Sequence, residues 1–443
     1  MKKRCMSMLL AGTLLAATMA GNVVTSFADE TSSDDQVTIK LATSLYVEAN
    51  HQAVFDKLLE KFNEEHPNIN VEIYGTGWDG FWQGITTEIA SGSEGDILQI
   101  TPSELNSYYA LRDGGAFLSL DDYISNSDVV TADDLVGQEE CQIDGKNVAL
   151  ANYAYGSSAI FYRKSILEEC GIDPASIVTQ EDLTNAMRTV TEKGYVGMGI
   201  VVGTHTFTWT EWGSNFVRPI TGLYFEDEKG PYSADTINVN SQAAIDMASW
   251  WQSLISEGLV KAGTDKSDAR ELFWNGQAAF DRDGPWFIGM TQAESQDVFD
   301  DMGVIAMPAV SYNGETYKAS PINYPYIMTI SSNCEHPDEA WTFIEWMASE
   351  EAQEIIAECG MVPCSKAYSG TDTYLAAYPM QAQMMGFEKD YVLTPNPTTP
   401  AFSELEQELN EGCQRMFGEN LEDPKTVLDE VADQMKSTMA DWE

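Results

Sequence analysis

The sequence is poor in basic residues. Its 443 residues contain 24 Lys and Arg against 70 Asp and Glu, which gives a formal net charge of −46. An electrostatic field of that sign repels phosphate backbones and anionic lipid surfaces, so we expect neither nucleic acid nor a membrane surface as a partner. The acidic surface either keeps the chain soluble or docks onto a basic partner, and the sequence leaves both interpretations open.

Signatures of metal sites and catalytic nucleophiles are also missing. The chain has only 4 His, which are far apart, and it has no C-x-x-C pair, so we expect no metal site. It contains no G-x-S-x-G nucleophile motif, no P-loop and no H-E-x-x-H motif. We therefore expect no cofactor.

Cysteine is scarce as well. Apart from Cys5, an even number remains, and an even number in an exported chain permits disulfides. Free buried thiols fit the sequence equally well. The residues concerned are Cys141, Cys170, Cys334, Cys359, Cys364 and Cys413.

The first 28 residues have the pattern of a secretory signal peptide. A basic start is followed by an apolar stretch from Met8 to Ala20 and by Ser-Phe-Ala at 26–28. No later segment approaches 18 uninterrupted apolar residues. Asn22 stands where an exported lipoprotein would carry its lipid-attachment cysteine. We expect an exported protein, periplasmic or extracellular and associated with the cell envelope, without a lipid anchor.

A G-x-G-x-x-G match at Gly75, Gly77 and Gly80 follows a β-branched run and raises the question of dinucleotide binding. The motif requires an acidic residue at the end of the next strand, whereas Asp96 opens that strand. The bulky Trp78 also occupies a position where backbone should approach a pyrophosphate. We do not favour a dinucleotide site, and the glycines predict a sharp turn that presents Trp78.

The order of the expected elements indicates two α/β lobes. Residues 29–36 read as a disordered lead-in, and residues 37–100 alternate strands with amphipathic helices, which predicts a parallel sheet. A second α/β series follows the apolar run at 149–164. Another apolar run, at 320–330, predicts a return between the lobes, and 443 residues are too many for one core.

Several stretches, in order, resemble those of one known family. They include FNEEHPNINVEI, ASGSEGDI, ALANYAYGSSAIFYRK, FWNGQAAFDRDGPWFIG, GVIAMPAV and HPDEAWTFIEWMASEEAQE. The chain resembles the extracellular solute-binding proteins of ABC importers, in the maltose-binding-protein-like, sugar-binding branch. Each motif alone is weakly specific, but the ordered set covers nearly the whole chain after the signal peptide.

The resemblance implies an α/β fold of the two-lobe periplasmic-binding-protein (Venus-flytrap) type, with type II topology and a sheet flanked by helices in each lobe. The expected divisions are lobe 1 at 37–151 and 327–368, lobe 2 at 156–322 and 374–443, and hinge crossings near 152–156, 322–326 and 369–373.

The resemblance also implies a function. A monomer would bind a sugar or oligosaccharide between its lobes by domain closure and deliver it to the membrane permease of an ABC carbohydrate importer, without chemistry of its own. A secreted glycoside hydrolase and a carbohydrate-binding surface lectin or adhesin remain as alternatives, because both would also show tryptophans and carboxylates.

Candidate ligand residues follow from the chemistry of sugars, which present an apolar face and a rim of hydroxyls. Flat rings suit the face, and carboxylate, amide and hydroxyl groups suit the rim. Trp286, in DGPWF, is the strongest candidate, because the family places a stacking tryptophan in this turn. The full set is Glu48, Trp78, Thr101, Glu104, Tyr153, Phe207, Trp209, Trp212, Asp283, Trp286, Asn323 and Tyr324.

Some of these residues also have structural interpretations. Glu48 could cap the helix that begins near His51, and Thr101 with Glu104 fits the capping box of a helix that starts at Pro102. The spacing of Trp209 and Trp212 indicates that at least one of them belongs to a core.

Overall fold

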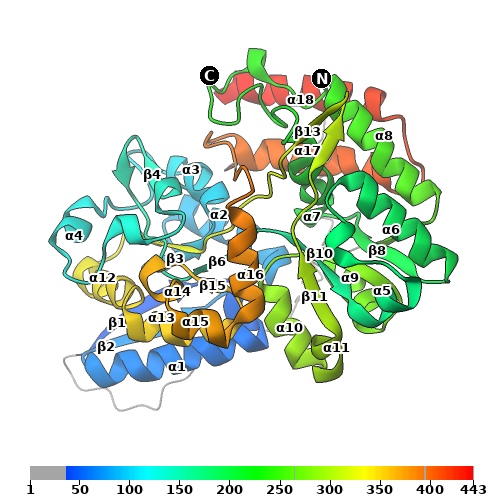
Figure 1. Ribbon diagram of the computed structural model, residues 1–443. Coiled ribbons are helices and arrows are strands. Elements are labelled where there is room, and N and C mark those ends of the chain that lie inside the picture. The colour runs from blue at the N-terminus through cyan, green and yellow to red at the C-terminus, as the bar shows by residue number, and fades with distance from the viewer. Residues whose placement is uncertain (1–35, 264, 394–395, 443) are drawn as a thin grey trace, which may run out of the picture.

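The computed structural model describes residues 36–263, 265–393 and 396–442, apart from the side chains of Trp78 and Asp79. Two separate sheets, each with its own hydrophobic core, divide these residues into two lobes (Figure 1). The first lobe contains the blue, cyan and yellow segments on the left of the view, and the second contains the green and red segments on the right.

The sheet of the first lobe has the order β14 (Ile327–Ile330), β3 (Ile97–Ile100), β1 (Val37–Ala42) and β2 (Ile69–Tyr74). β1 runs parallel to β2 and β3, and β14 is antiparallel to β3. The helices of this lobe are α1 (Ala49–Glu65), α2 (Trp78–Ser91), α3 (Pro102–Ala110), α4 (Asp121–Asn126), α12 (Pro337–Trp346), α13 (Glu350–Ile356), α14 (Lys366–Ser369) and α15 (Asp372–Ala377). Two short pairs complete it: β4 (Gln142–Ile143) with β5 (Lys146–Asn147), and β6 (Ala154–Tyr155) with β15 (Val362–Pro363).

Helix α1 shows how the apolar pattern produces this lobe. Val54, Phe55, Leu58 and Phe62 recur at helical spacing and are all buried in the first core, as the sequence predicts. Burial of each such side chain stabilises the fold by about 1.5–3 kcal/mol relative to exposure. The β1–α1–β2–α2–β3 succession therefore brings the carboxyl ends of β1 and β3 to one edge of the sheet.

The sheet of the second lobe has the order β11 (Met302–Ile305), β7 (Ala159–Arg163), β10 (Ala278–Asp283), β8 (Val196–Val201) and β9 (Val260–Gly263). The helices are α5 (Lys164–Cys170), α6 (Gln180–Glu192), α7 (Phe207–Trp209), the π-helix η5 (Thr210–Val217), α8 (Gln242–Ser256), α9 (Lys266–Trp274), α10 (Trp286–Glu294), α11 (Gln296–Asp301), α17 (Phe402–Phe417) and α18 (Pro424–Trp442). A hairpin joins β12 (Val310–Tyr312) and β13 (Glu315–Tyr317). Among the helices that the structure describes, none combines the length and apolar character needed to cross a membrane.

One expected helix is divided. The periodic run after His336 predicts a single helix, but α12 ends at Trp346 and α13 begins at Glu350. The side chain of Ser349 accepts a hydrogen bond from the Ala352 amide and caps the second helix. A local side-chain cap thus ends a helical pattern that the periodicity alone would continue.

The six described cysteines are free thiols, and four of them are buried. Of the two interpretations open from the sequence, the structure shows the unpaired form. Burial raises the pKa of the Cys359 thiol to about 12, so this group stays protonated near neutral pH.

The chain passes between the lobes more than once. Two passages lie side by side, because Tyr324 N donates to Gly156 O (3.1 Å) and Ser157 pairs with Asn323. The third expected passage, at 369–373, instead lies within the first lobe, where Tyr374 is fully buried in its core. Further along the chain, α16 (Pro379–Glu388) runs along the boundary between the lobes and packs against the second lobe (Figure 1).

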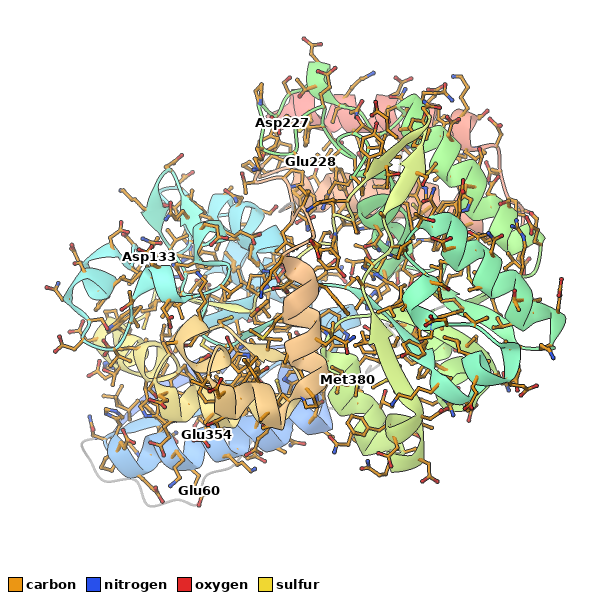
Figure 2. The ribbon with its side chains drawn as sticks, viewed as in Figure 1. Glu60, Asp133, Asp227, Glu228, Glu354 and Met380 are labelled. Atoms are coloured by element: carbon orange, nitrogen blue, oxygen red, sulfur yellow. The ribbon has the colours of Figure 1, made fainter. Side chains whose placement is uncertain are left out.

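Helix α16 joins this boundary through its apolar side chains. Met384 is buried in a cluster with Phe161 and Phe287 of the second lobe, and Met380 packs against the same cluster. Figure 2 shows Met380 at the end of α16 that faces α10. Local sequence could not separate a crossing helix from a lobe helix, because the apolar stripe of α16 is the same in either case.

Glu388 on α16 ties the hinge to this helix. Its carboxyl accepts hydrogen bonds from Ser157 Oγ (3.0 Å) and Tyr155 Oη (3.4 Å), and burial raises its pKa to about 7. The unfolded value is about 4.3, so the folded chain holds this proton more tightly, and stability is lost as pH rises from about 4.5 through 7.

We expect Glu388→Gln to reduce this loss of stability with rising pH, because the amide keeps an acceptor oxygen but carries no charge. Its Tm at pH 8 should exceed that of the unmodified chain by roughly 2–4 °C, with little difference at pH 5. Thermal scans from pH 5 to pH 8 measure this, with the exposed Glu419→Gln as matched control. Parallel pH profiles for all three proteins would contradict the assignment.

Candidate functional site

A cavity of about 280 Å³ lies between the lobes and takes its wall from both of them. The first lobe supplies residues that follow β1 and β3 or lie on α2, and the second supplies residues from the segments after β8 and β10 and from α17. The lining residues are Glu48, His51, Trp82, Thr101, Ser103, Glu104, Thr204, His205, Thr206, Phe207, Arg270, Trp286, Met290, Tyr324, Tyr326, Asn396 and Glu406. The carboxyl ends of the strands in open α/β sheets are where ligands usually sit.

On the first-lobe wall, His51 connects the cavity to the core. His51 is 1% exposed, and its Nδ1 lies 2.8 Å from Tyr153 Oη, whose ring stacks on Phe55. Burial lowers the pKa of His51 to about 3, so the imidazole is neutral at physiological pH. Glu48 Oε2 lies 3.8 Å from His51 Nε2, and the Glu48 side chain is 25% exposed.

Thr101 and Glu104 do not form the expected capping box. Thr101 is the N-cap of α3, but its side chain makes no capping hydrogen bond to the backbone. Its hydroxyl instead donates to Glu104 Oε2, and Ser103 Oγ donates to Glu104 Oε1 (2.9 Å). Burial raises the pKa of Glu104, and these two hydrogen bonds partly offset that rise. The three polar side chains thus form one group on the cavity wall.

Three aromatic rings from the second lobe meet at the opposite wall. The centroid of Trp286 lies 6.4 Å from that of Phe207 and 6.2 Å from that of Tyr324. Trp286 Nε1 donates to Asp283 Oδ1 at 2.5 Å, which fixes the indole at the start of α10. A Cβ at Gly284 would lie 2.2 Å from that indole, so this turn needs glycine for the ring to fold over it.

A buried network of charges supports this wall. Lys266 Nζ donates to Asp281 Oδ1 and to Arg282 O, both at 2.7 Å, and Arg270 Nε donates to Asp283 Oδ2 at 2.8 Å. Glu211 Oε1 lies 3.8 Å from the same lysine. Burial raises the pKa of Asp281 to about 6, against the attraction of Lys266, and raises that of Glu211 to about 7.

Glu406 on α17 completes the wall. Its Oε1 accepts a hydrogen bond from Trp209 Nε1 (3.1 Å), and burial together with the charge of Glu104 raises its pKa to about 8. The lobes also touch here, since Ser107 Oγ of α3 donates to Pro400 O just before α17 (2.9 Å). Two carboxyl groups from different lobes therefore face one cavity.

The structure brings together six of the residues that the sequence singles out: Glu48, Thr101, Glu104, Phe207, Trp286 and Tyr324. Asn323 lines a second, much smaller cavity of about 10 Å³. Tyr153, Trp209, Trp212 and Asp283 do not line the main cavity, because all four are fully buried behind it. Trp78 is the first residue of α2, but its side chain lies outside the described part of the chain.

Both tryptophans of the 205–217 segment are core residues, whereas the sequence predicted that at least one of them would be. Trp209 packs against Tyr224, and Trp212 packs against Phe417 at the end of α17. Trp209 lies on α7 and Trp212 on the π-helix η5, and both rings are fully enclosed by their neighbours. Their spacing gives no indication of that enclosure.

Several lining residues were missed. Trp82 stands in the same WDGFW stretch as Trp78, and Tyr326 lies in the same apolar run as the candidates Asn323 and Tyr324. Both residues therefore had a weak local signal. His51, Arg270, Asn396 and Glu406 had none, because the three-dimensional arrangement alone brings them to the cavity. Among the described residues, no group of three or more His, Cys, Asp and Glu side chains is placed to hold a metal ion.

The glycine motif has a packing role. A Cβ at Gly75 would lie 2.0 Å from the carbonyl oxygen of Thr43, so the loop after β2 presses against the end of β1. Gly77 then serves as the N-cap of α2. The close approach that requires glycine is thus an approach of two backbones in the first lobe.

Two α/β lobes that share one cavity define the class of proteins that bind a small solute between hinged domains. The chain belongs to the family described as bacterial extracellular solute-binding protein, whose sequence model matches residues 48–354. The exported location of that family and its solute-binding role therefore apply to this chain.

Comparisons with individual proteins agree with this family. An uncharacterized ABC transporter extracellular-binding protein of Pyrococcus horikoshii is 21% identical over 362 residues, which cover 80% of this chain and 78% of the relative. The GacH receptor of Streptomyces glaucescens, solved unliganded and with acarbose, superposes with a TM-score of 0.77 at 16% identity, covering 92% of this chain and 99% of the receptor. Maltose-bound MalE3 of T. maritima gives a TM-score of 0.77 at 18% identity, and the match covers 90% of this chain and 99% of MalE3. At these identities the solved structures show a shared fold.

Proposed function

We propose that this protein is the substrate-binding component of an ABC carbohydrate importer and that it closes its lobes on a sugar or short oligosaccharide. The observation that carries the proposal is the composition of the shared cavity. Flat rings of Trp82, Trp286 and Tyr324 line it together with the carboxyl, hydroxyl and amide groups that meet sugar hydroxyls. Its volume of about 280 Å³ is at the lower end for ligand sites, which favours one or two sugar units.

The solved neighbours support the same class of ligand. The GacH receptor is described in complex with acarbose and MalE3 with maltose. Closure also has a physical basis here, because the ligand would touch both lobes only in the closed form. A shift from 1:99 to 99:1 in favour of that form needs about 5.5 kcal/mol of differential affinity.

The remaining parts of the proposal concern location and partners. Residues 1–28 direct export, Asn22 leaves the chain without a lipid anchor at the usual position, and the released protein acts as a monomer. It presents the closed, loaded form to the permease subunits in the membrane and performs no chemistry on the ligand.

The test is a titration of the full chain with glucose, maltose, cellobiose and N,N′-diacetylchitobiose, followed by calorimetry and small-angle scattering. We expect at least one saccharide to bind with micromolar affinity or better, about −8 kcal/mol, and to reduce the radius of gyration. Release of new reducing ends would instead indicate a glycoside hydrolase. Binding without a change in dimensions would indicate a lectin, and the absence of any saccharide binding would reject the proposal.

A further inference from the structure

The cavity has more acidic than basic groups on its wall. Glu48, Glu104 and Glu406 line it, whereas Arg270 is the one Lys or Arg among the described lining residues. Arg270 is already held by Asp283, with contacts of 2.8 and 3.4 Å. Burial lowers the pKa of both lining histidines, to about 3 for His51 and about 4 for His205, so neither is cationic near neutral pH.

The charges beneath the aromatic wall balance one another. Lys266, Arg270 and Arg282 stand with Glu211, Asp281 and Asp283, and the closest ion pairs are between Lys266 and Asp281 and between Arg270 and Asp283. Arg282 faces the ring of Phe207, with its guanidinium carbon 4.6 Å from the ring centroid. Lys266 and Arg270 are therefore engaged by Asp281 and Asp283 within the network, and neither forms an ion pair with Glu104 or Glu406.

Glu104 and Glu406 are held by neutral donors. Thr101 and Ser103 donate to Glu104, and Trp209 donates to Glu406. Within the described chain, no Lys, Arg or His forms an ion pair with either carboxyl group. The titratable groups that interact electrostatically with Glu406 are Glu104 and three tyrosines (Tyr108, Tyr224 and Tyr324), and burial raises the pKa values of these tyrosines, so they stay neutral.

Two carboxyl groups that line one closing cavity and repel each other leave one of them protonated unless a cation enters. A protonated amine satisfies both, because it has three donors and one positive charge. The neighbouring faces of Trp82, Trp286 and Tyr326 add favourable surroundings for an ammonium group, since aromatic rings attract cations.

We infer that the cavity selects a saccharide that carries a protonated amine, which Glu104 of the first lobe and Glu406 of the second hold between them. The inference rests on the proposed carbohydrate function and specifies the ligand's charge. On binding, the ammonium takes the place of the proton on Glu406, and the two lobes gain a shared ionic contact. Anionic sugars are excluded by the same carboxylates.

The test compares chitobiose with free amines (the glucosamine disaccharide), N,N′-diacetylchitobiose and maltose by calorimetry at pH 6.5. We expect the free amine to bind about tenfold or more tightly than its acetylated form, as charge-assisted hydrogen bonds imply. Measured in phosphate and in imidazole buffer, its binding should release about one proton, because the carboxyl pair ionises. The neutral disaccharides should release none.

Glu104→Gln and Glu406→Gln should each reduce the affinity for the free amine about tenfold more than they reduce the affinity for the neutral disaccharides, because the amide keeps an acceptor oxygen for hydroxyls but carries no charge. Glu411→Gln, on the exposed face of α17, is the matched control and should behave as the unmodified chain. Equal or weaker binding of the free amine than of its acetylated form would overturn the inference and leave the carbohydrate proposal intact. Unchanged amine preference in both variants would also overturn it, and failure of all three disaccharides would count against both proposals.

Discussion

Lys266→Met is expected to lower the free energy of unfolding by about 3–5 kcal/mol, the usual consequence of removing one partner from a buried ion pair. The Lys266 side chain is 3% exposed and makes two hydrogen bonds of 2.7 Å, to Asp281 and to the carbonyl oxygen of Arg282. Methionine fills a similar volume, so the loss reports the charge and its hydrogen bonds. Asp281, which is fully buried, would then keep a carboxylate without its cation.

The deficit should depend on pH. Burial already raises the pKa of Asp281 to about 6, and loss of the nearby ammonium raises that pKa further. A raised carboxyl pKa makes the folded form bind a proton at low pH, so the deficit should shrink at pH 5 and grow towards pH 8. Urea unfolding at both pH values measures it, with Lys261→Met on the exposed part of β9 as control. A loss below about 1 kcal/mol at pH 8, typical of surface ion pairs, would show that the network is not a support of the lobe.

Local pattern was sufficient for most of the fold. The strands around residues 37–43, 69–74 and 96–100 and the helix after residue 51 were predictable because their apolar residues recur with a period of 2 or 3.6. The Asn-Gly pair at 313–314 also marks a hairpin turn in the sequence, because these two residues tolerate positive φ, and they adopt 51° and 82° between β12 and β13. The third passage between the lobes was not, because an amphipathic helix such as α16 gives no sign of which core it will meet.

The site was predictable where it follows strand ends and hidden where it depends on distant segments. Glu48 follows β1 after the short turn at Leu45–Val47, and Thr101 and Glu104 follow β3, so the rule for open α/β sheets places them at the edge that faces the cavity. Glu406 arrives from α17, about 300 residues along the chain from Glu104, and nothing near it in sequence indicates a cavity. The role of Trp209 depends on that same helix, because its indole hydrogen bonds to Glu406 rather than lining the wall.

The two lobes contribute different groups to the cavity wall, and this affects how a ligand is selected. The first lobe supplies polar groups together with the ring of Trp82, and the second supplies the rings of Phe207 and Trp286 together with Glu406. Each wall provides only part of the polar and aromatic surface. A ligand therefore gains its full set of contacts only when the lobes are together, which is the condition for closure.

Trp286→Ala is the second change with a large expected effect, a loss of about 2–3 kcal/mol in ligand binding, or roughly 30- to 150-fold in Kd. Trp286 packs against the core of the first lobe and against the second-lobe cluster that contains Phe161 and Phe287. Its ring therefore bridges the two lobes at the cavity. Truncation removes the flat surface and also leaves Asp283 without the indole donor at 2.5 Å. We therefore expect both a weaker affinity and a smaller change in radius of gyration on adding ligand.

Trp286→Phe separates these contributions, since it keeps a ring but removes the Nε1–H donor. We expect an intermediate loss of affinity, because part of the stacking surface remains while Asp283 loses the indole donor but keeps Arg270. Trp442→Ala is the matched control, because that tryptophan is 44% exposed on α18 and does not line the cavity. Calorimetric titration of the saccharide that binds the unmodified chain compares all four proteins. If Trp286→Ala folds normally and binds with unchanged affinity and closure, the aromatic wall is not the ligand platform, and the sugar would have to sit against the polar wall alone.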